Sequence, residues 1–404
     1  MTSVITIPTI SWLGRLALIV AASCSSLFIS CLSGNTTPDA SEQSLFTTGS
    51  SVAFQGEPGN VLIGDMNNDR KLDLVVTSAR ARSITVIEGK GDGQFGAALS
   101  NTTLAEPPGE MAIGDLNCDG KLDVAVASHD SYGVVVLTGD GKGSLTVAPS
   151  SPVVMKLSGH PHTHGLAVVD VNRDNKPDLI TCNSSDNDIS LALNDGRGNF
   201  TRAPQSFAVG PSPYPFAVGD VNNDGWPDVV ATATATGPAR REQLPLSRAL
   251  TLLLSDQKGG FTPRQLPLRT GEPWFAAIAD LNGDNKPDIV ATHHELNAMT
   301  VMIGDGRGGF TEANGSPFDF GVSLYHLIIV DVNRDGKTDV VATSGNSIRV
   351  LLGDGRGAFK QAGSMPVGPG AWRMAAADLN GDGAIDLVTS NSEGNSLSVL
   401  LGKA

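Results

Sequence analysis

"DLNGDNKPD", Asp280–Asp288, carries an acidic or amide side chain at four of its five odd places. Taken alone, such a stretch describes either a polar surface turn or a cage for an ion. The same nonapeptide occurs seven times, at a spacing of roughly 50 residues. The copies are "DMNNDRKLD" from Asp65, "DLNCDGKLD" from Asp115, "DVNRDNKPD" from Asp170, "DVNNDGWPD" from Asp220, "DLNGDNKPD" from Asp280, "DVNRDGKTD" from Asp331 and "DLNGDGAID" from Asp378. All seven carry Asp, Asn, Asp and Asp at places 1, 3, 5 and 9, a regularity that chance does not produce.

Short apolar segments flank every copy of the nonapeptide. A run such as "FAVG" or "AAIA" precedes it, and a run such as "VVATA" or "IVATH" follows it. A polar loop, a third apolar run and, in most copies, a glycine hairpin such as "GDGRGGF" at 304–310 complete the unit. These runs are short, rich in β-branched residues and bounded by turn residues, so they predict buried strands. Four strands per unit predict an all-β fold, a seven-bladed β-propeller with four-stranded blades and the nonapeptide between strands one and two.

The two ends of the chain predict how the ring closes. The last unit stops at "SVLLGKA" after its third strand, without a glycine hairpin or a fourth strand. "SLFTTGSSVAF", Ser44–Phe54, stands where a fourth strand would precede the first nonapeptide. We therefore expect this segment to complete the blade formed by residues 370–402, which removes two exposed sheet edges.

The nonapeptide has the donor set of a calcium site. Oxygens at places 1, 3, 5 and 9 and the backbone carbonyl of place 7 converge when the loop curls, and Ca²⁺ tolerates irregular geometry better than Mg²⁺. Place 6 is Gly or Asn in six copies, which suits a tight turn with positive φ, whereas Arg70 departs from this pattern. The alternative, a set of Asp and Asn turns without any ligand, is disfavoured by seven identical donor sets. The predicted calcium ligands are Asp65, Asn67, Asp69, Lys71, Asp73, Asp115, Asn117, Asp119, Lys121, Asp123, Asp170, Asn172, Asp174, Lys176, Asp178, Asp220, Asn222, Asp224, Trp226, Asp228, Asp280, Asn282, Asp284, Lys286, Asp288, Asp331, Asn333, Asp335, Lys337, Asp339, Asp378, Asn380, Asp382, Ala384 and Asp386.

The charge of the chain is consistent with cation binding. The 404 residues carry a net charge of −14, which disfavours nucleic acid as a partner because its phosphates require Lys and Arg. Without the first 31 residues, 42 acidic residues face 27 basic ones. One Ca²⁺ per loop would nearly cancel that excess. Three carboxylates in each loop repel one another when no ion is bound, so we expect calcium to stabilise the fold.

With these features the chain resembles the FG-GAP/VCBS repeat family, whose seven-bladed propeller forms the head of integrin α subunits and occurs in many bacterial surface proteins. The resemblance covers about residues 44–404 and rests on the aspartate loops, the "GDGRGGF"-type hairpins and the blade spacing. It implies calcium loops on the lower face and a partner at the upper face. Integrin propellers generally carry calcium loops in only some blades, whereas all seven units qualify here.

One register of the repeat concentrates aromatic residues. Six residues before each nonapeptide, at the expected upper mouth of the channel, stand Gly59, Gly109, His164, Tyr214, Trp274, Tyr325 and Trp372. An aromatic ring edged with polar groups holds sugars or peptide side chains through stacking and hydrogen bonds. The alternative is that these rings only plug the channel. With the polar residues of neighbouring places included, the candidate ligand-binding residues are His164, Tyr214, Trp274, Tyr325, His326, Trp372, Arg373 and Glu110.

The remaining metal-binding and redox-active side chains are few. "HPHTH", His160–His164, is a candidate transition-metal site because it alternates histidines. It shows no obvious fourth ligand, so a solvated loop or a channel-mouth position is the favoured interpretation. Cys118 and Cys182 are expected on different faces of the ring, and we expect no disulfide between them.

The N-terminal segment predicts export. Residues 1–31 have one charge, Arg15, followed by an apolar stretch and small residues, which is typical of a signal peptide. "LFISC" resembles a bacterial lipoprotein box with lipidation at Cys31, and ordinary cleavage or a retained anchor are the alternatives. Residues 32–43 then form a flexible polar tether, and residues 44–404 form the propeller. The expected location is the bacterial cell envelope, as an outer-membrane lipoprotein or in the periplasm, or outside the cell.

Together these observations predict a calcium-stabilised, non-enzymatic binding or adhesion protein that acts through its upper face. The expected partner is a cell-surface glycan or a protein, and the chain is expected to be a monomer. One alternative is a carbohydrate-active enzyme, a polysaccharide lyase or hydrolase, at the channel mouth. No catalytic residue is assigned, although Glu110, His164, His326 and Arg373 are the candidates there. Another alternative is a structural module of the envelope.

Overall fold

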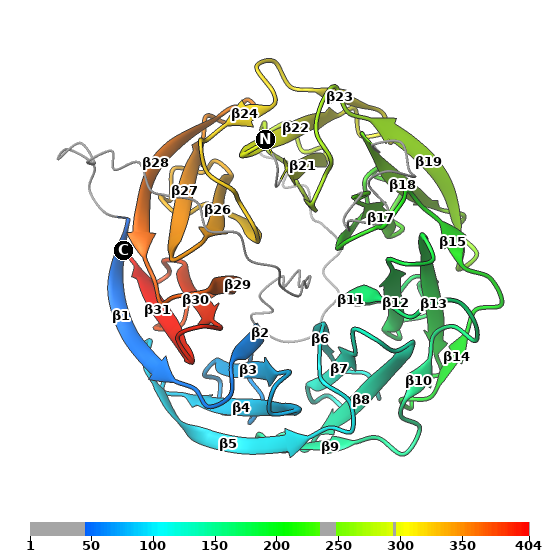
Figure 1. The fold of residues 1–404 in the computed structure, drawn as a ribbon, viewed down its shortest axis with the longest axis vertical. Helices are drawn as coiled ribbons and strands as arrows, with labels where there is room; N and C mark the ends of the chain where they lie inside the picture. Colours follow the sequence, from blue (N-terminus) through cyan, green and yellow to red (C-terminus); the bar gives the residue numbers. More distant parts are fainter. Residues whose placement is uncertain (1–44, 235–247, 294–295, 404) are drawn as a thin grey trace, which may run out of the picture.

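The computed structural model describes residues 45–234, 248–293 and 296–403 as seven antiparallel sheets around a central axis (Figure 1). The predicted all-β, seven-bladed propeller is therefore confirmed. The described residues include no helix that is long and apolar enough to cross a membrane. The predicted signal peptide, Cys31 and the tether lie outside the described residues.

The blades follow one another in chain order around the ring. Four blades contain β2 (Pro58–Gly64), β3 (Asp73–Ser78), β4 (Ser83–Gly89) and β5 (Phe95–Thr103); β6 (Met111–Gly114), β7 (Asp123–Ala127), β8 (Gly133–Gly139), β9 (Leu145–Val147) and β10 (Val153–Val154); β11 (Thr163–Val169), β12 (Asp178–Asn183), β13 (Asp188–Asn194), β14 (Phe200–Arg202) and β15 (Phe207–Ala208); and β16 (Phe216–Gly219), β17 (Asp228–Ala231), β18 (Ala249–Ser255) and β19 (Phe261–Pro267). Three blades contain β20 (Phe275–Ala279), β21 (Asp288–His293), β22 (Ala298–Gly304), β23 (Phe310–Glu312) and β24 (Phe318–Asp319); β25 (Leu327–Val330), β26 (Asp339–Ser344), β27 (Ser347–Gly353) and β28 (Phe359–Pro366); and β29 (Ala371–Ala377), β30 (Asp386–Asn391), β31 (Ser396–Gly402) and β1 (Phe46–Ala53). Each blade is named below by its first strand.

The hydrophobic core lies between neighbouring blades. Within a blade the first strand stands nearest the axis and the last forms the rim (Figure 1). In the β2 blade, Leu62 pairs with Val75 and Val75 pairs with Val86, so their side chains share one face of the sheet. That face packs on Met111 and Val126 of the β6 blade. Both faces of each blade are covered in this way, which explains why the inner strands are apolar runs without strict alternation.

The ring closes within one blade, as predicted. Strand β1 pairs antiparallel with β31, with Phe46 opposite Gly402. Figure 1 shows the two strands side by side, although they come from opposite ends of the chain. Phe46 is 1% exposed and packs in a cluster with Val350 and Leu400. The N-terminal strand therefore both covers the edge of β31 and fills the core between two blades.

The outermost strand is interrupted in three blades, where the repeat predicts a single strand. The breaks fall at "APSSP" (148–152), "APQS" (203–206) and "ANGSP" (313–317). Proline has no N–H to donate to a ladder, and serine and glycine favour turns, so these segments leave the sheet. In two blades a serine hydroxyl restores part of the ladder. Val136 N donates to Ser151 Oγ at 2.8 Å, and Val301 N donates to Ser316 Oγ at 3.0 Å.

Candidate functional site

Each nonapeptide curls into a loop between the first and second strands of its blade. Between β20 and β21, the amides of Asp284 and Asn285 donate to the Asp280 carboxylate at 3.2 and 2.7 Å. Asn282 Oδ1 accepts from the Asp284 amide at 2.9 Å, and Asp284 Oδ1 accepts from the Lys286 amide at 3.0 Å. The other six loops repeat these four bonds. Their side-chain oxygens are thus turned inward.

The aspartate at place 9 ties each loop to its own blade. Asp288 is fully buried, its Oδ2 accepts from the Leu281 amide at 2.9 Å, and its Oδ1 accepts from the Gly304 amide at 2.7 Å. A side chain at Gly304 would lie 2.0 Å from the Pro287 carbonyl oxygen, so the close approach requires glycine there. The other six loops repeat the two bonds to place 9 through Asp73, Asp123, Asp178, Asp228, Asp339 and Asp386.

Burial of these place-9 carboxyls raises their pKa values. The two donated amide bonds lower each pKa, and the neighbouring aspartates at places 5 and 1 raise it again. The pKa is about 6 for Asp73, Asp123, Asp178 and Asp228, and it is also raised for Asp288, Asp339 and Asp386. A cation among the three carboxylates would favour their charged form.

Two left-handed residues shape every loop. Place 6 has positive φ in all seven copies, as its Gly or Asn predicts, and Arg70 joins them with φ 69°. Place 4 also has positive φ in all seven copies, which the sequence pattern hides because this place holds four residue types. Its members are Asn68, Cys118, Arg173, Asn223, Gly283, Arg334 and Gly381. The departure at Arg70 therefore leaves the shape of the first loop intact.

The donor atoms of each loop are all oxygens, which fits a hard cation such as Ca²⁺. The residues that would hold it are those at places 1, 3, 5 and 9, with the carbonyl of place 7. In five loops the place-7 ammonium lies 2.9–3.8 Å from the place-5 carboxylate, at Lys71, Lys121, Lys176, Lys286 and Lys337. Where Trp226 and Ala384 replace lysine, the place-3 amide donates to that carboxylate instead, at 3.1 and 3.0 Å. In every loop the place-5 carboxylate therefore lies beside an N–H group, from a lysine ammonium or from an asparagine amide.

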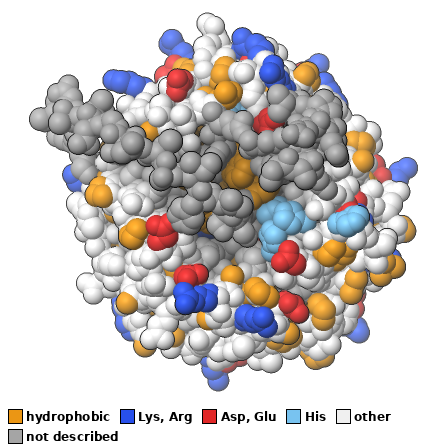
Figure 2. Space-filling view, in the orientation of Figure 1, with side chains coloured by type: hydrophobic (Ala, Val, Ile, Leu, Met, Phe, Trp, Pro, Cys, Tyr) orange, Lys and Arg blue, Asp and Glu red, His pale blue; other side chains and the backbone are white. Residues whose placement is uncertain are grey.

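The rings predicted at the channel mouth lie at the face opposite these loops. Trp274 precedes β20 and Asp280 follows it, so the five-residue strand separates the two. Figure 2 shows hydrophobic and histidine side chains next to one another at the centre of this face. The aromatic mouth and the acidic loops therefore lie on opposite faces of the ring.

Aromatic rings follow one another around the mouth. His164 stacks on Tyr214 with ring centroids 4.2 Å apart, and Tyr214 lies 4.3 Å from Trp274. Tyr325 and Trp372 form a second pair at 5.5 Å. His164 and Tyr214 are buried, whereas Trp274, Tyr325 and Trp372 keep part of their surface exposed. Trp274 thus packs against the buried Tyr214, whereas Tyr325 and Trp372 pack against each other.

These rings line a narrow pocket with a cavity volume of about 10 Å³, room for about one water molecule. Its lining consists of Tyr214, Pro215, Trp274, Phe275, Tyr325, His326, Trp372 and Arg373. Six of the eight candidate ligand-binding residues therefore meet at one pocket, while His164 lies behind Tyr214 and Glu110 lies outside the lining. Sequence reasoning missed Pro215 and Phe275, although they stand one place after two of the predicted rings. The polar members, His326 and Arg373, are 2% and 5% exposed rather than open at the rim.

Glu110 is buried beside Arg373 instead of edging the mouth. Its Oε1 lies 3.5 Å from Arg373 Nη2 of β29, which joins two blades separated by the β2 blade. Burial raises the pKa of Glu110 to about 8, against the opposing effects of the Arg373 charge and the Asn60 amide. Asn60 Nδ2 also donates to the Gly109 carbonyl at 2.8 Å, which braces the same seam. The pair therefore links the inner strands across the first blade.

Two histidines of the "HPHTH" motif, His162 and His164, are joined by a third histidine that the sequence did not reveal. His129, from the loop after β7, lies against His162 and His164. No signal in the sequence connects His129 to the motif, because the two segments belong to different repeats. Cys118 is exposed and Cys182 is buried, and the two do not form a disulfide, as predicted.

Comparison with protein families identifies the repeat. A model described as the FG-GAP-like repeat matches residues 65–126, 115–181, 170–231, 280–342 and 331–389. The chain belongs to the FG-GAP-like repeat family. Each match opens at place 1 of a nonapeptide and ends in the second strand of the following blade, so the acidic loops mark the start of the repeat unit. No curated protein matches this sequence.

Solved structures share the arrangement of blades with this FG-GAP-like propeller. BBS1N in complex with ARL6DN, soaked with lead, aligns with a TM-score of 0.62 at 11% identity, over 89% of this chain and 98% of that chain. The same complex soaked with mercury aligns equally, at 12% identity. A lectin of Agrocybe aegerita that recognises non-reducing terminal N-acetylglucosamine aligns with a TM-score of 0.53 at 18% identity, over 78% of this chain and 80% of that chain. At these identities the likeness shows the fold alone.

Proposed function

We propose that this FG-GAP-like propeller is an exported, calcium-stabilised binding protein without enzymatic activity, which binds a cell-surface glycan against the aromatic rings at its channel mouth. The observation that carries the proposal is the trio of half-buried rings, Trp274, Tyr325 and Trp372, around one pocket. Aromatic faces that are partly exposed and fixed from behind bind a ligand with little loss of side-chain freedom.

The pocket is too narrow to enclose a ligand. Its cavity volume of about 10 Å³ leaves room for about one water molecule, far below the range of about 300–1,000 Å³ that is typical of sites for drug-sized molecules. A terminal sugar ring would therefore stack on the exposed parts of the aromatic side chains around the pocket, while its hydroxyls need hydrogen bonds. Arg373, whose guanidinium lies 5.8 Å from the Trp372 ring centre, is the charged side chain in the lining.

Two structural neighbours illustrate the uses of a propeller of this kind. The Agrocybe aegerita protein recognises a terminal sugar, and BBS1N forms a complex with the protein ARL6DN. Both resemble this chain in fold and neither shares its sequence to an extent that carries function. A glycan is the first expectation here because aromatic side chains surround the mouth, and a protein ligand is the other outcome of the test.

Of the four acid–base candidates, His326 and Arg373 line the pocket, whereas Glu110 and His164 lie outside it, so the part of the lining that the structure describes holds no carboxylate that could serve as an acid or base. A general acid or base must come within hydrogen-bond reach of a substrate. Glu110 is 1% exposed and lies beside Arg373 rather than in the pocket lining. His164 lies behind Tyr214, and its Nε2 faces His162 Nε2 at 2.8 Å. The carboxylate and this histidine are therefore both turned away from the pocket.

The export and calcium parts of the proposal rest on separate features. Residues 1–31 have the pattern of a signal peptide, and Cys31 stands in a lipoprotein-like box. The oxygen donors at places 1, 3, 5, 7 and 9 recur in all seven loops, with the same backbone bonds in each. A protein anchored by a lipid at Cys31 would present its propeller on a polar tether.

A glycan array tests the binding function. We expect the protein, held in millimolar Ca²⁺, to bind glycans that share one terminal sugar, and we expect Trp274→Ala and Trp372→Ala each to weaken binding about two- to tenfold, since a stacked ring contributes about 0.5–1.5 kcal/mol. Trp226→Phe is the matched control, because Trp226 is a partly exposed tryptophan in a loop at the opposite face. An array without hits, or hits that both alanine variants retain, would contradict the glycan function and direct the search to a protein ligand.

A further inference from the structure

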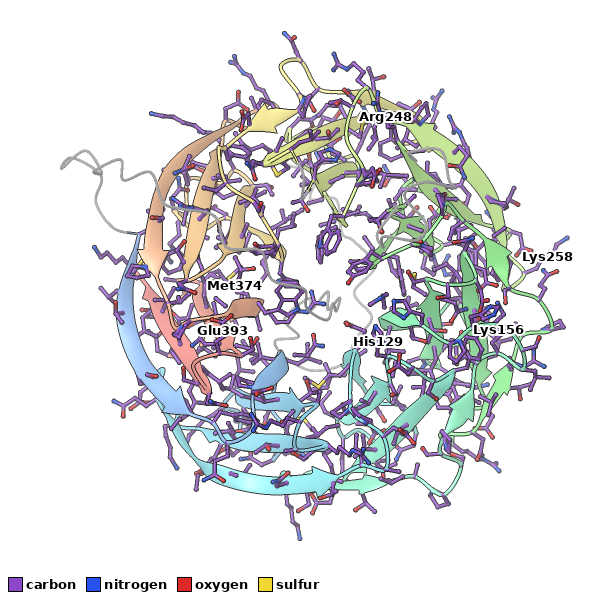
Figure 3. The ribbon with its side chains drawn as sticks, in the orientation of Figure 1. His129, Lys156, Arg248, Lys258, Met374 and Glu393 are labelled. Carbon is purple, nitrogen blue, oxygen red and sulfur yellow. The ribbon has the colours of Figure 1, made fainter. Side chains whose placement is uncertain are left out.

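Three histidines from two blades gather beside the aromatic pocket. His129 follows β7, whereas His162 and His164 lie at the start of β11. Figure 3 shows His129 at the inner side of its blade, facing the channel. The three ring centroids are 4.1 to 4.8 Å apart, and one ligand nitrogen from each ring lies within 4.8 Å of the other two. Among the residues that the structure describes, no other group of three His, Cys, Asp or Glu side chains is gathered this closely, the loop aspartates included.

We propose that His129, His162 and His164 bind a divalent transition-metal ion of the zinc and copper class. Imidazole nitrogen is a preferred ligand for these ions and a poor one for Ca²⁺, which takes oxygen donors. The Nε2 atoms of His162 and His164 are 2.8 Å apart. Two nitrogens on one tetrahedral zinc ion are about 3.3 Å apart, given bonds of about 2.0–2.1 Å. A small increase in the distance between the Nε2 atoms of His162 and His164 would therefore admit the ion.

Backbone hydrogen bonds hold the two histidine segments together. The Thr163 amide, between His162 and His164, donates to the His129 carbonyl at 2.9 Å. The Thr163 hydroxyl donates to the Ser131 carbonyl at 3.0 Å, which adds a second link between the same two blades. The Ser184 amide donates to the His162 carbonyl at 2.8 Å. The ligands thus stand on positions that are fixed before any ion arrives, which lowers the cost of ordering them.

Two neighbours orient the imidazole rings. Asp130 Oδ1 lies 2.6 Å from His129 Nδ1, so a proton on that nitrogen leaves Nε2 of His129 available as a ligand. A carboxylate that accepts the second N–H of a ligating histidine is the usual support of a zinc-bound imidazole. The ring of His164 stacks on Tyr214. Asp130 and Tyr214 are therefore positioning residues for the site.

Three protein ligands leave one coordination position for water or for a donor atom of a bound molecule. His164 is buried, while His129 and His162 are half-buried, so the cluster has a closed side and a side open to solvent. Tyr214 touches the cluster on one face and lines the aromatic pocket on the other. An ion held here would stand next to the proposed glycan site without being part of it.

Zinc titration of the calcium-loaded chain tests the proposal. The chain is purified without a polyhistidine tag and in a Cys118→Ser background, since Cys118 is exposed and could bind zinc itself. We expect calorimetry to show one tight zinc site, and we expect Co²⁺ to give the visible absorption of a tetrahedral nitrogen-ligated ion. His129→Ala and His162→Ala should each weaken binding at least tenfold. Asp130→Asn should weaken it about tenfold, because the ring of His129 loses its support.

His160→Ala is the matched control, since His160 belongs to the same motif but is exposed outside the cluster. It should leave the zinc affinity unchanged. Each variant is first shown to melt like the parent in calcium. X-ray absorption of the zinc-loaded parent provides a measurement that needs no variant, and we expect histidine nitrogens around the ion. Oxygen ligands alone, no saturable zinc binding at micromolar concentration, or equal affinity in His129→Ala and His160→Ala would overturn the site.

Discussion

Arg70 shows how strictly the loop imposes its geometry on single residues. It stands at place 6 with φ 69°, where Gly120 and Asn175 have 82° and 63°. A left-handed backbone costs a residue with a Cβ about 1–2 kcal/mol, less for Asn and almost nothing for Gly. The first loop keeps the hydrogen bonds of the others, since the Arg70 amide donates to Asp65 Oδ2 at 2.9 Å. It therefore holds the common shape at a higher conformational cost.

Replacing this arginine should relieve that cost. We expect Arg70→Gly to stabilise the calcium-loaded protein by about 1 kcal/mol, while Asn175→Gly changes little because Asn tolerates this conformation. For a chain of this size, thermal unfolding followed by circular dichroism should show a rise of about 2 °C. Gly120→Arg is the reciprocal variant and should lower the midpoint by a similar amount. Equal midpoints for Arg70→Gly and the parent would mean that the loop pays no strain at place 6.

The residue scale also shows what the sequence alone could predict. The sequence predicted the positive φ at place 6, because Gly and Asn are the residues that favour it. It did not predict the positive φ at place 4, since Asn, Cys, Arg and Gly all adopt this conformation there. His129 was hidden for another reason. Its neighbours His162 and His164 come from the next repeat, and only the packing of two blades brings the three rings together.

At the level of secondary structure, strand β1 closes the ring. It pairs with β31 over most of its length, and Phe46 fills a cluster between two blades. Deleting residues 44–55 removes about six backbone pairings worth about 1 kcal/mol each, and the burial of a phenylalanine worth about 2–3 kcal/mol. It also exposes the edge of β31, which invites aggregation.

We expect that deletion to lower the melting temperature of the whole propeller and to increase light scattering on heating. Deleting residues 1–43 instead is the matched control, and this variant should melt like the parent. If the deletion of residues 44–55 melts at the parent temperature, β1 does not close the ring. The assignment of this strand was possible from the sequence because the last repeat lacks a fourth strand. The breaks in the outer strands were not, because serine hydroxyls such as Ser151 Oγ take over their bonds.

For the whole molecule, the two faces of the ring differ in how regular they are. The lower face repeats seven acidic loops with the same hydrogen bonds, and each place-9 aspartate accepts from the backbone of its own blade. The upper face differs from blade to blade, with glycine in two blades and rings in five. The sequence repeat predicted the acidic loops and the number of blades. It could not predict which rings share a pocket, because the packing of the blades around the ring brings those side chains together.

Bound calcium ions, as proposed, would make the stability of the propeller depend on metal concentration. An ion that binds the folded state alone stabilises it by about 2.7 kcal/mol per site at a hundred times its dissociation constant. We therefore expect the melting temperature in millimolar Ca²⁺ to exceed that in excess EDTA by well over 10 °C, with Mg²⁺ restoring only part of the difference. Calorimetry of Asp280→Ala, which removes one loop's first donor, should show one calcium site fewer than the parent. Thr251→Ser, a buried change away from the loops, is the control for folding. Superimposable melting curves in Ca²⁺ and EDTA would mean that the seven loops are turns held by their own hydrogen bonds, and that the acidic charge of the chain has another cause.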